Sequence, residues 1–177
     1  SVYARTKGEG EIWARKALKS TTVIRPSVVF GKGDGLLNRF GSMATMSPAL
    51  PMPGGGETRF QPVYVGDVAQ AIARAVDDPS TAGKTFELGG PEEMTLRQIL
   101  ELVLNETHRD RALLPLPWPV ASLMGMMLEP MSWVGLAPPL TRDQVTLLKS
   151  DNVVGADARG LADLGVTATG IEAIAPT

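Results

Sequence analysis

The chain has 177 residues, of which 44% are hydrophobic and 20% are charged, and its formal net charge is -2. This balance is typical of a domain with a hydrophobic core, and it excludes the basic stripe that nucleic-acid phosphates require. The sequence has no cysteine and 1 histidine, which excludes disulfides and cysteine-ligated zinc, so no metal site is expected. No apolar run reaches the roughly 20 residues that span a bilayer. Together with a start that lacks signal-peptide character, this favours a soluble or peripheral protein.

The first part of the sequence contains a helical pattern followed by a strand pattern. Residues 3–18 are rich in Glu, Lys, Arg and Ala and predict a helix, weakened by Gly8 and Gly10. Residues 21–30 are β-branched and almost continuously apolar, which predicts a strand buried on both faces of a parallel sheet, with Pro26 at its end or at a break. The next expected elements are a turn, a short helix, a proline- and glycine-rich stretch and a second strand, at 31–35, 36–46, 48–56 and 59–65.

Helix boundaries are better marked in the second part of the sequence. Asp67 is expected to be the N-cap of a helix over 67–78, which Pro79 ends, and a short strand is expected at 84–88. Two boxes of the Thr-x-x-Gln type then predict the starts of further helices, at Thr95 with Gln98 and at Thr141 with Gln144. The alternation of helices and strands predicts an α/β fold.

One pair of side chains on the first helix suggests chemistry. Tyr3 and Lys7 are four residues apart, so a phenol and an ammonium lie one turn apart on one helix face. A free phenol titrates near about pH 10, so it needs a neighbouring cation to act as an acid or base at neutral pH. Lys7 is the expected source of that charge, although the same spacing also occurs on ordinary solvated helix faces.

A second motif follows one strand later, where residues 25–31 read Arg-Pro-Ser-Val-Val-Phe-Gly. The two motifs together resemble the extended short-chain dehydrogenases/reductases, whose active-site helix carries Tyr-x-x-x-Lys and whose next strand ends in a similar Arg-Pro motif. The sequence is also similar along most of its length to a narrower group, the bacterial relatives of the accessory subunit of respiratory complex I that has this fold. The segments that carry this similarity are SVYARTKGEGE, GDGLLNRF, FQPVYVGDVA, FELGGPE, PPLTRDQVTLLKSDN and LADLGV.

The resemblance implies an α/β fold that is the C-terminal half of an extended short-chain dehydrogenase/reductase. It would contain the last strands and helices of a Rossmann-type doubly wound sheet and a small α+β substrate domain. Residues 1–35 and 60–82 would belong to the Rossmann-like part, and residues 36–59 and 83–177 to the small substrate or partner domain. The family's glycine-rich nucleotide-binding half would lie upstream and is absent from this sequence, so it does not distinguish NAD from NADP.

The resemblance also implies which residues form the site. Tyr3 would be the catalytic phenol, and Lys7 would assist it and hydrogen-bond the nicotinamide ribose of bound NAD or NADP. Pro26, Ser27 and Val28 would line the nicotinamide.

Three residues are secondary candidates for contact with a substrate: Arg25, Phe30 and Asp67. Arg25 could pair with a substrate carboxylate or phosphate, or equally with a carboxylate of the protein. Asp67 is expected above all to cap its helix.

Residues 118–133 are crowded with Met, Leu and Trp, and the helix expected there is apolar on nearly every side. Such a helix is either buried in the small domain or forms an adhesive face for complex I subunits or a membrane surface. On the second alternative, replacing Met124 and Met127 with Glu should release a partner without unfolding the protein.

Two functions remain open. The resemblance along the chain implies an NAD(P)H-binding accessory or assembly subunit of NADH:ubiquinone oxidoreductase (complex I), in the bacterial cytoplasm or peripheral on the inner membrane. The alternative is an active NAD(P)-dependent oxidoreductase or sugar-nucleotide epimerase/dehydratase that uses Tyr3 and Lys7. The segment from Leu36 to Glu57 argues against an epimerase, because Arg39 is its only cation positioned for a diphosphate.

Overall fold

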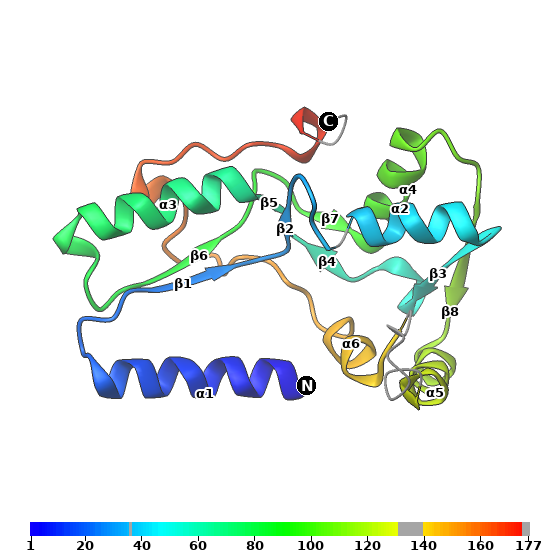
Figure 1. Ribbon diagram of the computed structural model, residues 1–177, viewed down its shortest axis with the longest axis horizontal. Coiled ribbons are helices and arrows are strands. Elements are labelled where there is room, and N and C mark those ends of the chain that lie inside the picture. Colours follow the sequence, from blue (N-terminus) through cyan, green and yellow to red (C-terminus); the bar gives the residue numbers. More distant parts are fainter. Residues whose placement is uncertain (36, 131–139, 175–177) are drawn as a thin grey trace.

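The computed structural model describes residues 1–35, 37–130 and 140–174, and they form an α/β structure (Figure 1). The helices are α1 (Val2–Ala17), α2 (Leu37–Met46), α3 (Val65–Asp77), α4 (Leu96–Glu106), α5 (Trp118–Leu128) and α6 (Arg142–Leu147). The strands are β1 (Val23–Pro26), β2 (Val29–Phe30), β3 (Ala49–Pro53), β4 (Arg59–Phe60), β5 (Val63–Tyr64), β6 (Thr85–Leu88), β7 (Met94–Thr95) and β8 (Ala112–Leu116).

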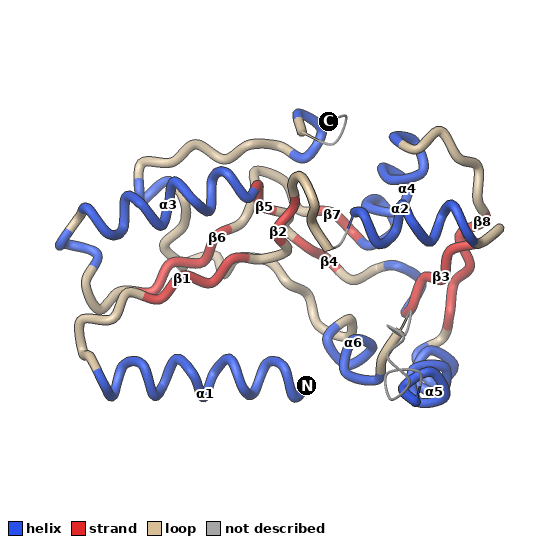
Figure 2. The backbone as a smooth tube through the Cα atoms, viewed as in Figure 1, coloured by secondary structure: helices blue, strands red, loops and turns tan. Residues whose placement is uncertain are grey.

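The strands of the described residues pair two by two (Figure 2). Parallel pairs form between β1 and β6, β2 and β5, and β3 and β8, whereas β4 and β7 are antiparallel. The β1–β6 register runs from Val23 beside Thr85 to Pro26 beside Leu88. Parallel neighbours need long crossover connections, and α3 lies within the connection between β1 and β6, so the α/β class predicted from the sequence is confirmed.

Two hydrophobic clusters hold the elements together. One packs α3 against β5, β6 and the segment after residue 160, and its buried members are Val63, Ala71, Phe86, Leu88, Leu161, Leu164 and Val166. The other packs α2 and α4 against β3 and β4, and its buried members are Ala44, Leu50, Met52, Phe60, Leu96, Ile99, Leu100 and Leu104. Phe60 and Val63 belong to different clusters, so the short 59–64 segment joins the two parts of the molecule.

Helix α1 stands apart from both clusters. It runs along the face of the β1–β6 pair opposite α3, antiparallel to β1 (Figure 1), but none of its residues is buried. Polar contacts hold it in place instead: Arg15 donates to the Gly83 carbonyl at 2.9 Å and to the Thr85 hydroxyl at 2.6 Å. One face of the β1–β6 pair is therefore covered by apolar side chains and the other by a helix held through charged groups.

The helix predictions are confirmed, with one correction. Both capping boxes are present, with Thr95 and Thr141 accepting from the backbone N–H of Gln98 and Gln144. The prediction that Asp67 is an N-cap is wrong, because α3 begins earlier, with Tyr64 as its N-cap residue, and Asp67 lies in the first turn. The backbone continues as helix through Val65 and Gly66, so the carboxylate is left free to bond elsewhere.

The strand predictions need more revision. The strand expected over 21–30 is split into β1 and β2 at the break after Pro26, and in β1 only Val23 is buried, because β1 has one sheet neighbour among the described residues. The stretch at 48–56 contains β3, whose Leu50 and Met52 are fully buried. The prolines of this stretch made its alternation of apolar residues hard to recognise in the sequence. Pro115 had the same effect on β8, the strand that pairs with β3.

The helices in the described ranges are all too short or too polar to cross a membrane.

Candidate functional site

Tyr3 and Lys7 lie on one face at the start of α1, as the sequence predicts. The Lys7 ammonium lies 5.5 Å from the centre of the Tyr3 ring, within the range of a cation–π contact. Tyr3 is 57% exposed. Within the described part of the chain, the Tyr3 hydroxyl and the Lys7 ammonium make no hydrogen bond to the protein, so both groups are available to a ligand.

The start of α1 is anchored from the far end of the chain. The Asp143 carboxylate, in the first turn of α6, accepts from the backbone N–H of Val2 at 2.7 Å and of Tyr3 at 3.2 Å. The Ser1 hydroxyl also donates to it, and these hydrogen bonds, that of Ser1 first, lower the pKa of the Asp143 carboxyl. A carboxylate at a helix amino terminus is stabilised by the free N–H groups there. The sequence analysis missed Asp143, since nothing in the local pattern shows that residues 140 apart meet.

Arg25 anchors the middle of α1 to β1. Its guanidinium donates to both Glu11 oxygens, at 3.0 and 2.7 Å, and to Glu87 at 3.2 Å. The hydrogen bond with Glu11 is the main cause that raises the pKa of Arg25, and it lowers the pKa of the Glu11 carboxyl. The sequence left open whether Arg25 pairs with a substrate or with a carboxylate of the protein. In the structure it pairs with carboxylates of the protein.

Two residues of the segment expected to line the nicotinamide, Ser27 and Val28, make hydrogen bonds within the protein. The Ser27 N–H donates to the Leu88 carbonyl at 2.8 Å, and its hydroxyl donates to the Asn152 carbonyl at 2.6 Å. The Val28 carbonyl accepts from Val63 at 2.9 Å. Pro26 is exposed. The hydrogen bond from Ser27 to Asn152 is a second long-range contact that no local sequence pattern predicts.

Phe30 and Asp67 are both buried. Phe30 is fully buried, and its ring centre lies 5.8 Å from that of Tyr64. Asp67 is 3% exposed and accepts from the backbone N–H and the hydroxyl of Thr169, at 2.6 and 3.0 Å. In this arrangement Asp67 ties α3 to the C-terminal segment, and Phe30 packs beneath the surface.

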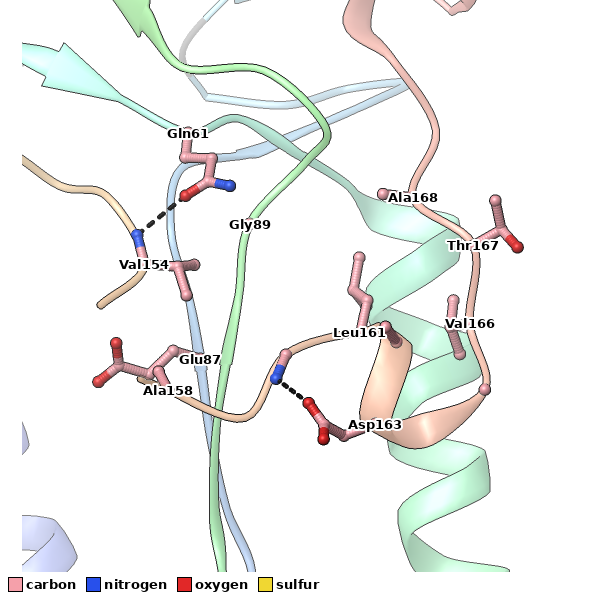
Figure 3. Close-up of a pocket in the computed structure, with 13 residues that line it drawn as sticks. Gln61, Glu87, Gly89, Val154, Ala158, Leu161, Asp163, Val166, Thr167 and Ala168 are labelled. Carbon is pink, nitrogen blue, oxygen red and sulfur yellow. Dashed lines mark hydrogen bonds between the residues drawn. The ribbon is translucent and has the colours of Figure 1, made fainter. Parts of the chain in front are cut away.

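A pocket of about 730 Å³ lies at the carboxyl end of β6, lined by β6, Gln61 and the segment 154–168 (Figure 3). The Gln61 amide accepts from Val154 and donates to the Gly90 carbonyl, both at 2.9 Å. Asp163 accepts from the Gly160 N–H at 2.7 Å. These polar side chains hold backbone segments in place, so the pocket offers no convergent set of catalytic groups.

The start of α1, which carries Tyr3 and Lys7, and the carboxyl end of β1 lie at the same end of this pair of elements. Glu11 and Arg25 are in contact, and α1 and β1 run in opposite directions (Figure 1). From Glu11 back to Tyr3 is about 12 Å along a helix, and from Arg25 forward to Val28 is about 10 Å along a strand. Tyr3 and Val28 therefore both lie beyond the Glu11–Arg25 contact, on the same side of it along the two elements.

Helix α5 carries an exposed apolar surface. Only Ala121 and Gly125 are buried, whereas Met127 is 71% exposed, and four further apolar side chains of α5 are exposed: Val120, Leu123, Met124 and Met126. The expectation of a helix buried in the small domain is therefore not met over Trp118–Leu128. Residues 131–133 lie outside the described residues. We refer to these five exposed side chains, Val120, Leu123, Met124, Met126 and Met127, as the α5 face.

Sequence comparisons identify relatives along most of the chain. The family model of the RmlD substrate binding domain matches residues 1–153. The mitochondrial NADH dehydrogenase (ubiquinone) 1 alpha subcomplex subunit 9 of Arabidopsis thaliana is 35% identical over 90% of this chain and 41% of its own length. The Mus musculus protein of that name is 35% identical over 95% of this chain and 44% of its own length. The chain thus spans less than half the length of these relatives.

Solved structures share the fold at low identity. A UDP-glucose 4-epimerase from Thermotoga maritima, solved with UDP-glucose, has a TM-score of 0.63 and 19% identity, covering 98% of this chain and 49% of the epimerase. A nucleoside-diphosphate-sugar epimerase from Staphylococcus aureus has a TM-score of 0.68 and 13% identity, covering 96% of this chain and 57% of that protein. These matches confirm that the chain has part of an epimerase-type short-chain dehydrogenase/reductase fold.

Proposed function

We propose that this chain, which belongs to the family of RmlD substrate-binding domains, is part of an accessory subunit of a respiratory NADH dehydrogenase (complex I). The observation that carries the proposal is the 35% identity to subunit 9 of the alpha subcomplex over 95% of this chain. The epimerases match the fold at only 13–19% identity. We place the protein on the bacterial cytoplasmic side of the inner membrane, attached peripherally through the α5 face.

We further propose that the subunit holds NAD or NADP, with Tyr3 and Lys7 on the ribose and Pro26, Ser27 and Val28 beside the nicotinamide. The free phenol and ammonium at the start of α1 support this, as does the tie between α1 and β1 through Glu11 and Arg25. Several structural relatives were solved with NAD, among them MoeE5 with UDP-glucose and NAD. In this arrangement Asp143 positions Tyr3 by holding its backbone N–H.

An active enzyme is the second candidate, favoured by the intact Tyr3–Lys7 pair. When bound, a nicotinamide gives or takes a hydride. The Tyr3 hydroxyl would transfer a proton to or from the oxygen of a carbonyl or alcohol, and the Lys7 ammonium would stabilise the phenolate that remains. A cofactor that never turns over can be held by hydrogen bonds from these two groups and does not need an activated phenol.

The first test separates occupancy from catalysis. The full-length protein is purified, any bound nucleotide is released and identified, and turnover is measured on a panel of carbonyl and sugar-nucleotide substrates. The accessory-subunit proposal expects a nicotinamide nucleotide and no turnover by the natural protein or by Tyr3→Phe. Turnover that Tyr3→Phe reduces by at least about a hundredfold, while the matched Tyr64→Phe leaves it unchanged, would establish the enzyme and reject the proposal.

The second test concerns attachment through the α5 face. Replacing Met127 with Glu places a charge in the centre of any apolar contact made there, and desolvating that charge should release the subunit from the complex. We expect Met127→Glu to lose co-migration with NADH dehydrogenase activity on native gels of solubilised membranes, with the thermal unfolding midpoint unchanged.

The matched control is Met46→Glu, the same replacement at a methionine that is 85% exposed on α2. It should leave co-migration intact. Co-migration of Met127→Glu at the natural level would show that the α5 face is not the attachment surface.

A further inference from the structure

An apolar pocket of about 300 Å³ lies behind α5, between α2, α4, α5 and α6. Its walls include Phe40 and Met43 of α2, Leu96 of α4, Met124 and Leu128 of α5, and Leu147 of α6. Four helices that are distant in sequence thus direct apolar side chains into one space. The pocket is separate from the Tyr3–Lys7 pair and shares none of the residues proposed to hold a nucleotide.

The polar side chains at the pocket are already used by the protein. Gln144 accepts from the Thr141 N–H at 3.0 Å as part of the α6 capping box. Arg39 also has an interaction partner. In the described part of the chain, no buried side-chain nitrogen or oxygen lacks a hydrogen bond. A polar ligand would therefore lose its hydration here without gaining partners.

Water is a poor occupant of this space. A volume of about 300 Å³ holds roughly ten waters at about 30 Å³ each, and a buried water needs two to four polar partners, which the apolar walls do not supply. While only water fills the pocket, its apolar walls stay hydrated, and the free energy gained by covering them is lost. An apolar occupant of about the same volume, roughly ten non-hydrogen atoms, would cover them.

The rim indicates how such an occupant enters. Met124 of α5 and Leu147 of α6 line the pocket and are 37% and 38% exposed, so the pocket reaches the surface beside these two side chains. Met124 also belongs to the α5 face, which makes the opening continuous with the exposed apolar surface. A molecule with an apolar tail and a polar head could insert the tail and leave the head outside. Two methionines in the walls can adapt to a flexible chain.

We propose that this pocket binds the aliphatic tail of an amphipathic molecule, with roughly ten carbon atoms inside. The inference does not depend on nucleotide binding or on a respiratory partner. The tail can come from a free fatty acid or, where the α5 face lies on a membrane as proposed above, from a lipid of that membrane. Both sources present the same alkyl chain to the pocket.

The test uses the full-length protein and cis-parinaric acid, a fatty acid whose fluorescence rises in apolar surroundings. We expect saturable binding of one molecule per protein, and displacement by 1-decanol, which carries the chain without a carboxylate. Leu147→Trp fills the pocket from its rim and should weaken binding about tenfold or more, since losing room for two methylenes has that effect. Met124→Gln keeps the side-chain length but places an amide in the wall, and it should also weaken binding.

The matched control is Leu123→Trp, at an α5 residue that is 50% exposed and does not line the pocket. It should bind as the natural protein does. Absence of saturable binding, or equal weakening by Leu123→Trp and Leu147→Trp, would overturn the proposal, because the probe would then be adsorbing to the α5 face. A parallel titration with parinaroyl phosphatidylcholine vesicles identifies the source: a signal there indicates a membrane lipid, and a signal from the free acid alone indicates a fatty acid.

Discussion

Arg25 shows how one side chain positions the candidate site. It holds Glu11 of α1 through three hydrogen bonds and reaches Glu87 of β6 through a fourth. Because α1 buries none of its residues, this ion pair and the Asp143 bonds set where Tyr3 lies relative to β1. Changes at Arg25, Glu11 or Asp143 should therefore act on the site through position, without touching a ligand.

The Glu11–Arg25 pair makes stability depend on pH in a defined direction. Arg25 lowers the pKa of Glu11 below its ordinary value of 4.5, so the folded state binds fewer protons than the unfolded state near that pH. The stabilisation is present above pH 4.5 and is lost as pH falls through the lowered pKa of the folded state. Since the Arg25 side chain is 49% exposed and screened by solvent, the contribution is at most about 1 kcal/mol.

We expect Glu11→Gln to lower the free energy of unfolding at pH 7 and to have little effect at a pH below the lowered pKa of the folded state, where the carboxylate is protonated in both states. Urea unfolding at the two pH values measures this. Glu9→Gln is the control, because Glu9 makes only a 3.9 Å pair with Arg5 that is more than half exposed on both sides. A deficit of equal size at both pH values would show that the ion pair is not its source.

Residue patterns within one turn of helix could be predicted from the sequence, and contacts between distant segments could not. The Tyr3–Lys7 face and the two capping boxes depend on spacings of three or four residues, which the helix itself fixes. Asp143 and Asn152 reach the site from more than 120 residues away. Tertiary packing alone brings them there, and a single sequence has no spacing rule for it.

At the scale of elements, α5 and α6 approach each other closely at Gly125. A Cβ at this position would lie 2.9 Å from the Arg142 nitrogen and from the Thr141 carbonyl carbon, both of which are backbone atoms. Gly125 therefore permits the close helix contact that forms one side of the apolar pocket. Helix propensity alone would favour alanine there, so the packing and the local preference conflict.

Gly125→Ala should lower the free energy of unfolding by about 1–3 kcal/mol, because backbone atoms cannot move aside as a flexible side chain can. Gly10→Ala is the matched change: no atom lies within 4 Å of a Cβ there, and up to about 1 kcal/mol of stabilisation is expected from the better helix former. Denaturant unfolding of both variants gives the comparison. Stabilisation by both replacements would mean that α5 and α6 are not in backbone contact.

Elements with an uninterrupted pattern were predictable, and those interrupted by proline were not. Most apolar residues of α4 are buried, as the pattern predicts, whereas in α3 Ala71 is buried but Ile72 and Val76 are 47% and 78% exposed. Strands β3 and β8 were missed because Pro51, Pro53 and Pro115 suggest a loop, although proline is tolerated in short pairs at the edge of a sheet. Asp67 was misplaced for a related reason: an Asp before an apolar run suggests a cap, but the helix had already begun.

At the scale of the whole molecule, the two faces of the β1–β6 pair are covered differently. On one face α3 packs with Ala71 and Val68 against Phe86 and Leu88 of β6. On the other face α1 contributes no buried residue, and its own apolar side chains, Ile12 and Trp13 among them, are 55% and 68% exposed. A helix of this length is marginal alone in water, and Gly8 and Gly10 weaken it further.

Local stability should therefore differ sharply between the helices. Opening α1 breaks its hydrogen bonds to Asp143, Arg25 and Gly83 but exposes no buried apolar residue of the helix, whereas opening α4 exposes Leu96, Ile99 and Leu100 from the core. We expect hydrogen exchange of the full-length protein to show α1 amides exchanging at least about a hundredfold faster than those of α4. Mass spectrometry of peptides from the two helices measures it. Comparable protection would mean that α1 is held by contacts beyond these polar anchors.

Addition of NAD or NADP should slow exchange in α1 and leave α4 unchanged if Tyr3 and Lys7 bind the nucleotide. Unchanged exchange in α1 at saturating nucleotide would instead place any nucleotide site away from this helix.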